Sequence, residues 1–148
     1  MAKARVKRKK QNLIRIPLYY QEKEVEGNFL IRILNDDKAK KMLEDEKTKD
    51  EVMVLTTWWK PFSWQEQNEI TKASMKKGPE VLPGEIDWLR FRDLQVKTCL
   101  KEWDAVDEDD NPVPATPENI NSLPANIVAS LLGKYTEMVS LTEDESKN

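Results

Sequence analysis

Hydrophobic residues are grouped differently in the two halves of this 148-residue chain, and the grouping predicts strands first and helices afterwards. Leu13–Tyr20 and Phe29–Leu34 are short apolar segments rich in β-branched and aromatic residues, and the turn-like Glu26-Gly27-Asn28 lies between them. We expect these segments to form a β-hairpin in which Pro17 is restricted to an edge or a bulge. Val52–Thr57 is a third strand candidate.

Residues 35–51 separate the second and third strand candidates and are dominated by charge, since twelve of them are Asp, Glu or Lys. Only Met42 and Leu43 could anchor this stretch to a core. It is therefore expected to be an exposed short helix or a mobile loop.

Helical signals begin after residue 62. Ser63 followed by Glu66 is a capping-box pattern, so a helix is expected from Trp64 to about Lys76. A long helix is expected over 85–102, after a linker that contains Gly78-Pro79 and Pro83-Gly84. Its apolar positions recur at helical spacing and are Ile86, Leu89, Val96, Leu100 and Trp103, widened by Trp88, Phe91 and Cys99.

Two further helices follow an acidic, proline-bearing loop over 104–114. Thr116-Pro117-Glu118 combines a capping residue, a first-turn proline and an acid, which favours a short helix. Pro124 opens a final helix with a broad apolar stripe that ends at Val139. The elements predict an α+β fold, with a small N-terminal antiparallel β element and a C-terminal bundle of three to four helices.

The same pattern divides the chain into three parts. Residues 1–12 are expected to be a disordered basic arm, and residues 142–148 a disordered polar tail. Residues 13–141 are expected to form one α+β domain, β-rich over 13–57 and helical over 63–141. A chain of this length supports one such core.

The amino-acid composition excludes several kinds of catalytic and metal-binding chemistry. The chain has no histidine, which excludes His-based triads, His general bases and the commonest zinc ligand. Its single cysteine, Cys99, lies in an apolar helical stretch, where a buried and inert thiol is expected. No glycine-rich phosphate loop or other catalytic motif is present. We expect a non-enzymatic protein with no cofactor, no metal and no small-molecule substrate.

One acidic segment imitates a calcium-binding loop. Asp107, Asp109, Asn111 and Glu118 occupy positions 1, 3, 5 and 12 of that loop. Position 6 requires a glycine for its sharp turn, and this chain has Pro112 there. A solvated acidic loop is therefore expected, and the domain is expected to fold without metal.

Charge is distributed unevenly along the chain. The net charge is −3, yet the first ten residues carry six positive charges and no acid, which leaves −9 for the rest; the six are Lys3, Arg5, Lys7, Arg8, Lys9 and Lys10. No apolar segment follows the arm, so it is not expected to be a secretory signal, and no segment is expected to cross a membrane. The arm could contact an acidic partner or nucleic acid. The rest of the chain is acidic, however, and offers no positive electrostatic field that would hold a phosphate backbone.

Five tryptophans are candidates for core packing or for binding a partner. Trp58 and Trp59 are adjacent, so on a strand they would face opposite sides of the sheet, one filling the core and the other exposed. An exposed tryptophan near Phe62 would be a protein-binding anchor, because aromatic residues dominate interface energetics. Trp58, Trp59, Phe62 and the basic side chains of the arm are thus the candidate partner-binding residues.

The segment from Val96 to Val139 resembles the tail assembly chaperones of tailed bacteriophages. In those proteins a helix ends in a tryptophan, a "D-x-D-G-x-P-x-P" loop follows, and a threonine-capped helix and an "LP" helix come next. The matching residues here are Trp103, Asp107, Asp109, Pro112, Pro114, Thr116, Asn119, Leu123 and Pro124. Asn111 replaces the glycine of the loop, and the basic arm is a second departure from the family pattern.

The resemblance implies a small phage protein in the host cell cytoplasm that keeps tape-measure or tail-tube subunits soluble until the tail assembles. Two alternatives remain open at this point. One is a structural component of the virion in the tail, baseplate or neck, whose arm contacts neighbouring subunits. The other is a nucleic-acid-associated regulator that uses the arm.

Deletion of Met1 to Lys10 is expected to leave the free energy of unfolding within about 0.5 kcal/mol, because the arm has no apolar periodicity. The deletion should weaken partner binding in a salt-dependent way, since exposed charges are screened over roughly 8–10 Å at physiological ionic strength. Thermal melting and binding at low and moderate salt measure both effects. Unfolding of the truncated protein would make the arm an integral part of the domain.

Overall fold

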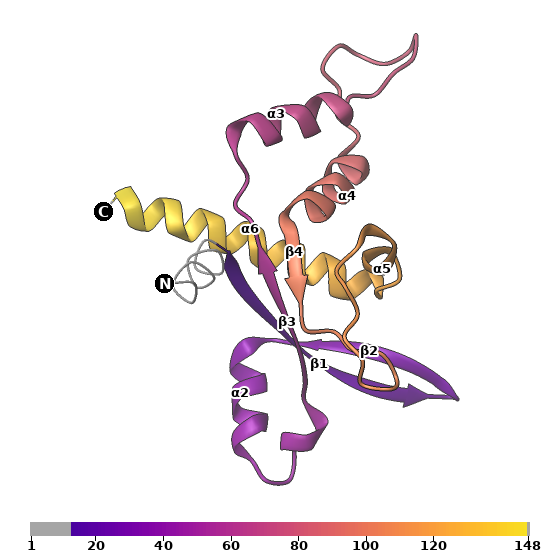
Figure 1. Cartoon of the computed structure of the whole chain (residues 1–148), viewed down its shortest axis with the longest axis vertical. Coiled ribbons are helices and arrows are strands. Elements are labelled where there is room, and N and C mark those ends of the chain that lie inside the picture. The colour runs from indigo at the N-terminus through magenta and orange to yellow at the C-terminus, as the bar shows by residue number, and fades with distance from the viewer. Residues whose placement is uncertain (1–12, 148) are drawn as a thin grey trace.

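The computed structural model describes the backbone of residues 13–147 and the side chains of residues 13–140 (Figure 1). The basic arm over 1–12 lies outside the described residues, and so do the side chains over 141–148. Among the described residues, no helix combines the length and the apolar character that a membrane span needs.

The centre of the molecule is a four-stranded antiparallel sheet in the order β2-β1-β3-β4. Its strands are β1 (Ile14–Val25), β2 (Asn28–Leu34), β3 (Met53–Trp59) and β4 (Leu100–Trp103). Several helices follow the first three strands, which confirms the α+β class expected from the sequence. Strand β1 is the longest, and it pairs with β3 along its first half and with β2 along its second half.

The β1–β2 hairpin is confirmed, and its turn is formed by Glu26 and Gly27. Both residues have positive φ, 51° and 82°, which is the arrangement of a two-residue turn matched to the twist of the strands. Pro17 lies where β1 has no β2 partner, since the ladder to β2 begins only at Tyr19. It is therefore at a local edge, and its carbonyl accepts a hydrogen bond from Lys134 Nζ at 2.9 Å.

The charged stretch between β2 and β3 forms helix α2 (Asp36–Glu44) and the 3₁₀ helix η1 (Lys49–Glu51). Asn35 caps α2, because its side-chain oxygen accepts a hydrogen bond from Lys38 N at 2.7 Å. Ala39 is the residue of α2 that is fully buried. The expectation of an exposed short helix is therefore confirmed for Asp36–Glu44.

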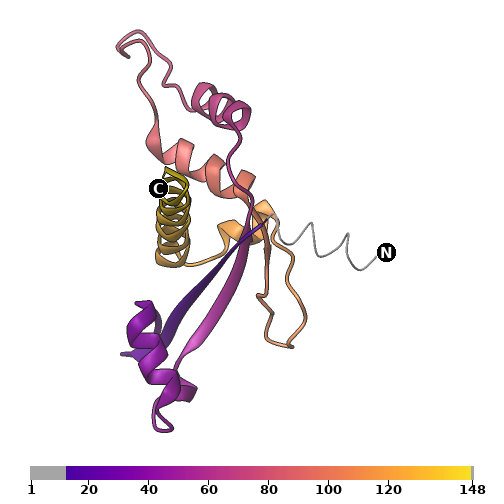
Figure 2. The same cartoon turned by 90° about the vertical axis from the view of Figure 1, so that its left-hand side faces the viewer.

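Helix α6 (Ala125–Lys147) lies against one face of the sheet, as Figure 2 shows end-on. The indole of Trp59 stacks on the ring of Tyr135, with centroids 4.9 Å apart and planes inclined by 24°. Both side chains are buried, and they belong to a core whose other members are Ile16, Leu18, Leu55, Val96, Cys99, Leu100, Ile120, Ile127, Leu131 and Leu132. The backbone of α6 includes most of the segment that the sequence assigns to a disordered tail.

Three shorter helices lie between β3 and α6 in the chain: α3 (Trp64–Ala73) and α4 (Trp88–Cys99) before β4, and α5 (Pro117–Asn121) after it. The predicted long helix over 85–102 is wrong at both ends. It begins at Trp88, where Asp87 caps it, and it ends at Cys99. Leu100 to Trp103 form strand β4 instead, because the outer edge of β3 offers backbone groups that a strand satisfies and a helix does not.

Trp103 therefore lies outside α4, although the sequence assigns it to the apolar face of the long helix. It lies in β4 opposite Thr57, and its half-buried side chain packs against the core cluster that contains Leu131 and Tyr135. Its indole N–H donates a hydrogen bond to the carbonyl of Val113. Trp103 thus joins the edge strand to the loop that follows it.

Replacement of Trp59 by alanine is expected to lower the free energy of unfolding by about 3–5 kcal/mol, because it removes a fully buried indole and its stacking contact with Tyr135. The matched control is Trp64→Ala, which removes an indole that is 77% exposed and should change stability by no more than about 0.5 kcal/mol. Chemical denaturation of the two variants measures the difference. Equal midpoints would contradict the core position of Trp59.

Candidate protein-interaction surface

The three aromatic residues proposed as partner anchors occupy different environments. Trp59 is fully buried, and its indole N–H donates to Thr57 Oγ1 at 2.6 Å, so it offers no surface to a partner. Trp58 is half-buried on the opposite face of the sheet, as the alternation along a strand requires. Phe62 is also half-buried, with its ring 6.5 Å from that of Phe91. The charged arm residues proposed beside them lie outside the described residues.

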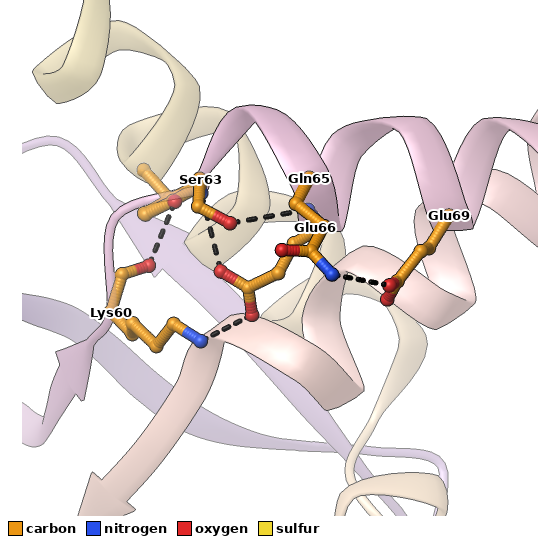
Figure 3. A network of polar contacts seen from close by, with 6 residues as sticks. Lys60, Ser63, Gln65, Glu66 and Glu69 are labelled. Atoms are coloured by element: carbon orange, nitrogen blue, oxygen red, sulfur yellow. Dashed lines mark hydrogen bonds and ion pairs between the residues drawn. The ribbon is translucent and has the colours of Figure 1, made fainter.

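A polar network fixes the joint between β3 and α3 (Figure 3). Ser63 and Glu66 form the predicted capping box: Glu66 N donates to Ser63 Oγ at 3.1 Å, and Ser63 N donates to Glu66 Oε1 at 3.2 Å. Lys60 Nζ forms an ion pair with the other carboxylate oxygen of Glu66. On the first turn of the helix, Gln65 Nε2 donates to Glu69 Oε1 at 3.2 Å. The network sets the direction in which α3 leaves the sheet.

The same joint is connected to the core through Tyr135. Its hydroxyl donates to the carbonyl of Lys60 at 2.9 Å. Burial raises the pKa of the Tyr135 phenol and also that of the Cys99 thiol, which is fully buried at the end of α4. Because the thiolate is the reactive form, Cys99 is the inert core thiol that the sequence predicts.

The beginning of α4 is held against the end of α3 by backbone and side-chain contacts. Asp87 N donates to the carbonyl of Ser74 at 2.7 Å, and Arg90 Nε donates to the carbonyl of Ala73 at 2.7 Å. Lys76 pairs with Glu85 at 3.2 Å on the loop between the helices, and an antiparallel bridge joins Met75 to Ile86. These contacts give the first turn of α4 a fixed position.

That fixed turn presents large apolar side chains to solvent. Leu89 is 78% exposed and Trp88 is 63% exposed, and the ring centroids of Trp88 and Phe91 lie 5.4 Å apart with their planes inclined by 64°. Trp64, at the start of α3, is 77% exposed. Exposed apolar side chains on a positioned helix are candidates for contact with another protein.

A groove between α4 and α6 adjoins these side chains, and we call it the α4–α6 groove. It consists of two hollows of about 290 and 540 Å³, which share Arg92, Ala129 and Leu132. The first is lined by Leu89, Val96 and Leu123 among others, and the second includes Trp88, Phe91 and Gly133. Since Ala129 and Gly133 are small, the α6 wall of the groove lies close to its backbone.

Sequence reasoning missed this surface because it assigned Trp88 and Leu89 to the buried face of a long helix. A signal was nevertheless present. At about 100° per residue, Trp88, Leu89 and Phe91 span about 160° of the helix circumference, which is wider than the stripe of about 100° that packs against a single neighbour. Part of such a helix must remain uncovered.

The residues of the proline-bearing motif build a structural joint. Thr116 caps α5 by accepting a hydrogen bond from Asn119 N at 3.3 Å, and Asn119 Nδ2 donates to the carbonyl of Pro114 at 2.8 Å. Pro117 occupies the first turn of α5. Leu123 packs against the core cluster, and Pro124 directly precedes α6.

The acidic loop is closed by one of its own carboxylates. Asp107 Oδ1 accepts hydrogen bonds from Asp109 N at 2.8 Å and from Asn111 N at 3.0 Å. Pro112 pairs with Val106 across the loop. Within the described residues, no group of three or more acidic or cysteine side chains is placed to hold a metal ion.

Replacement of Glu66 by glutamine should lower the melting temperature at pH 7. The hydrogen bond from Lys60 lowers the pKa of Glu66 below its ordinary value of 4.5. A carboxylate whose pKa is lower in the folded state than in the unfolded state stabilises the fold at pH values above its unfolded-state pKa. This contribution is lost as the pH falls through the folded-state pKa. The melting difference should therefore shrink below about pH 4.5. The control is Glu69→Gln on the exposed side of α3, and a pH-independent difference for Glu66→Gln would contradict the ion pair.

Comparison of the chain with protein-family models, with curated proteins and with solved structures gives no match. The resemblance to tail assembly chaperones therefore depends on the residues between Val96 and Val139 themselves. What the molecule binds has to be inferred from its surface.

Proposed function

We propose that this protein is a non-enzymatic binding factor that covers an apolar segment of another protein. The observation that carries the proposal is the pair of exposed side chains, Trp88 and Leu89, that line the two hollows of the α4–α6 groove. Burying one large apolar side chain contributes about 1.5–3 kcal/mol. A few such contacts are sufficient for binding that is specific and reversible.

The shape of the groove favours a helical segment as the bound element. Its long walls are α4 and α6, and Ile120 and Asn121 of α5 also line the first hollow. Apolar side chains predominate, with Arg92, Asp93 and Glu137 among the lining residues. An amphipathic helix places anchors at three- and four-residue intervals, which suits a groove of this kind. Tape-measure proteins of phage tails are long and helical, so the groove agrees with the client that the family resemblance implies.

We therefore propose a tail assembly chaperone or tail-morphogenesis factor of a tailed bacteriophage, acting in the host cell cytoplasm. It would shield apolar segments of tape-measure or tail-tube subunits until they assemble. Retention in the mature particle is the alternative fate. Mass spectrometry of purified virions separates the two, because a chaperone leaves the assembly and a tail component stays.

Replacement of Leu89 by lysine is expected to weaken client binding by at least about tenfold, equivalent to about 1.4 kcal/mol, because it introduces a charge into an apolar contact. The experiment co-expresses the protein with the tape-measure protein and, separately, with the tail-tube subunit of the same phage. It measures how much client remains soluble and co-purifies.

The matched control is Leu82→Lys, because Leu82 is a leucine of similar exposure, 74%, on the loop between α3 and α4. This variant should retain wild-type binding. The proposal fails if neither client is bound by the wild-type protein, or if Leu89→Lys binds as well as Leu82→Lys. Melting curves of both variants confirm that the fold is unchanged.

A further inference from the structure

Gly133 lies in the interior of α6, where glycine is an unfavourable residue. Glycine loses more conformational freedom than alanine when a helix forms, so it destabilises the middle of a helix. Packing within the described residues does not require it. Gly133 has no positive φ, and a Cβ atom at this position would meet no atom of another element within 4 Å. The space over Gly133 is therefore open to a group from outside the described structure.

That space belongs to the second hollow of the α4–α6 groove, which has a volume of about 540 Å³. Trp88 and Phe91 line the hollow from α4, and Gly133 and Thr136 line it from α6. The hydroxyl of Thr136 already donates to the carbonyl of Leu132 at 2.9 Å. Aromatic side chains of α4 thus lie across the hollow from a position of α6 that has no side chain.

A large apolar side chain from another helix fits this arrangement. The side chains at a contact set the distance between packed helices, which is about 8–10 Å, so the absence of a side chain at Gly133 admits a close neighbour. A side chain inserted over Gly133 would also contact the aromatic residues Trp88 and Phe91 that line the same hollow. Well-packed contacts of this kind dominate interface energetics.

Two charged side chains on opposite walls indicate what else the bound segment carries. Arg92 of α4 lines both hollows, and Glu137 of α6 lines the second. Both are exposed, and neither forms an ion pair with another side chain of residues 13–140. Asp93 of the first hollow, by contrast, is paired with Lys97 at 3.0 Å. Arg92 and Glu137 are therefore the charges that a partner has to match.

We infer that the second hollow binds a client helix with a large apolar side chain over Gly133, an acidic residue beside Arg92 and a basic residue beside Glu137. The inference rests on the proposed function, because it specifies the chemistry of the segment that the α4–α6 groove covers. An amphipathic helix places such residues together, since positions three and four apart lie on one face. Charges at the rim of an interface discriminate against wrong partners.

Three synthetic helical peptides test the charge pattern. All three share one face of leucines at three- and four-residue intervals. The first carries glutamates on one side of that face and lysines on the other, the second carries glutamates on both sides, and the third carries lysines on both. Fluorescence anisotropy of the labelled peptides measures their dissociation constants for the full chain. The wild type should bind the first peptide at least about fivefold more tightly than the other two.

Charge reversal in the hollow should change this preference. Arg92→Glu should prefer the lysine peptide over the glutamate peptide by at least about tenfold, and Glu137→Lys should show the opposite preference. Lys40→Glu is the matched control, because Lys40 is an exposed residue of α2 that lines neither hollow. It changes the net charge as Arg92→Glu does and should keep the wild-type preference. A wild type that binds all three peptides equally, or a control that behaves as Arg92→Glu does, would overturn the inference.

Two substitutions of Gly133 separate the open space from the effect of glycine on the helix. Alanine and leucine are both better helix formers, so Gly133→Ala and Gly133→Leu should each raise the melting temperature. Leucine fills the hollow and should weaken binding of the first peptide by at least about tenfold, whereas alanine should change it by less than about threefold. Unchanged binding by Gly133→Leu would contradict the insertion of a side chain. Lower melting temperatures for both variants would show that the fold itself requires the glycine.

The remaining outcomes concern other occupants of the hollow. Stronger peptide binding after deletion of residues 1–12 would assign the hollow to the arm. A wild-type dimer that Gly133→Leu dissociates would assign it to a second copy of the chain, and either result would overturn the inference. If no peptide bound the wild type while a phage subunit still co-purified in a Leu89-dependent way, the inference would fail and the proposed function would stand.

Discussion

The stacking of Trp59 on Tyr135 is the contact on which the rest of the structure depends. It joins the end of β3 to the middle of α6, two elements that are distant in the chain, and it excludes water from the centre of the core. Around it, Leu18 and Leu55 of the sheet meet Leu131 of α6. Without this buried contact, α6 would lack its principal support and the sheet would expose one face.

The same contact positions the part of the molecule that we assign to binding. The Tyr135 hydroxyl reaches the carbonyl of Lys60, and Lys60 in turn holds Glu66 at the start of α3. Hydrogen bonds from Asp87 and Arg90 then fix α4 to the end of α3. The exposed side chains of the first turn of α4 are therefore presented by a connected series of contacts that begins in the core.

The α4–α6 groove provides side-chain contacts between helices, with small residues such as Ala129 and Gly133 on one wall. Contacts of this kind depend on which apolar side chains a partner presents, because the anchors of a helix recur at three- and four-residue intervals.

Local signals in the sequence were sufficient to predict the α+β class, the hairpin, β3, and the caps of α3 and α5, because each depends on residues close together in the chain. Among the candidate anchors, Trp59 proved to be core, whereas Trp88 and Leu89, which the sequence assigned to the core, are exposed. Tertiary structure decided these positions, and it also made a strand of Leu100–Trp103. The physical reason is that helical periodicity identifies the apolar face of a helix but not which element covers that face. A strand, in turn, is stabilised by backbone groups of another strand, such as those of Thr57, which lie far away in the sequence.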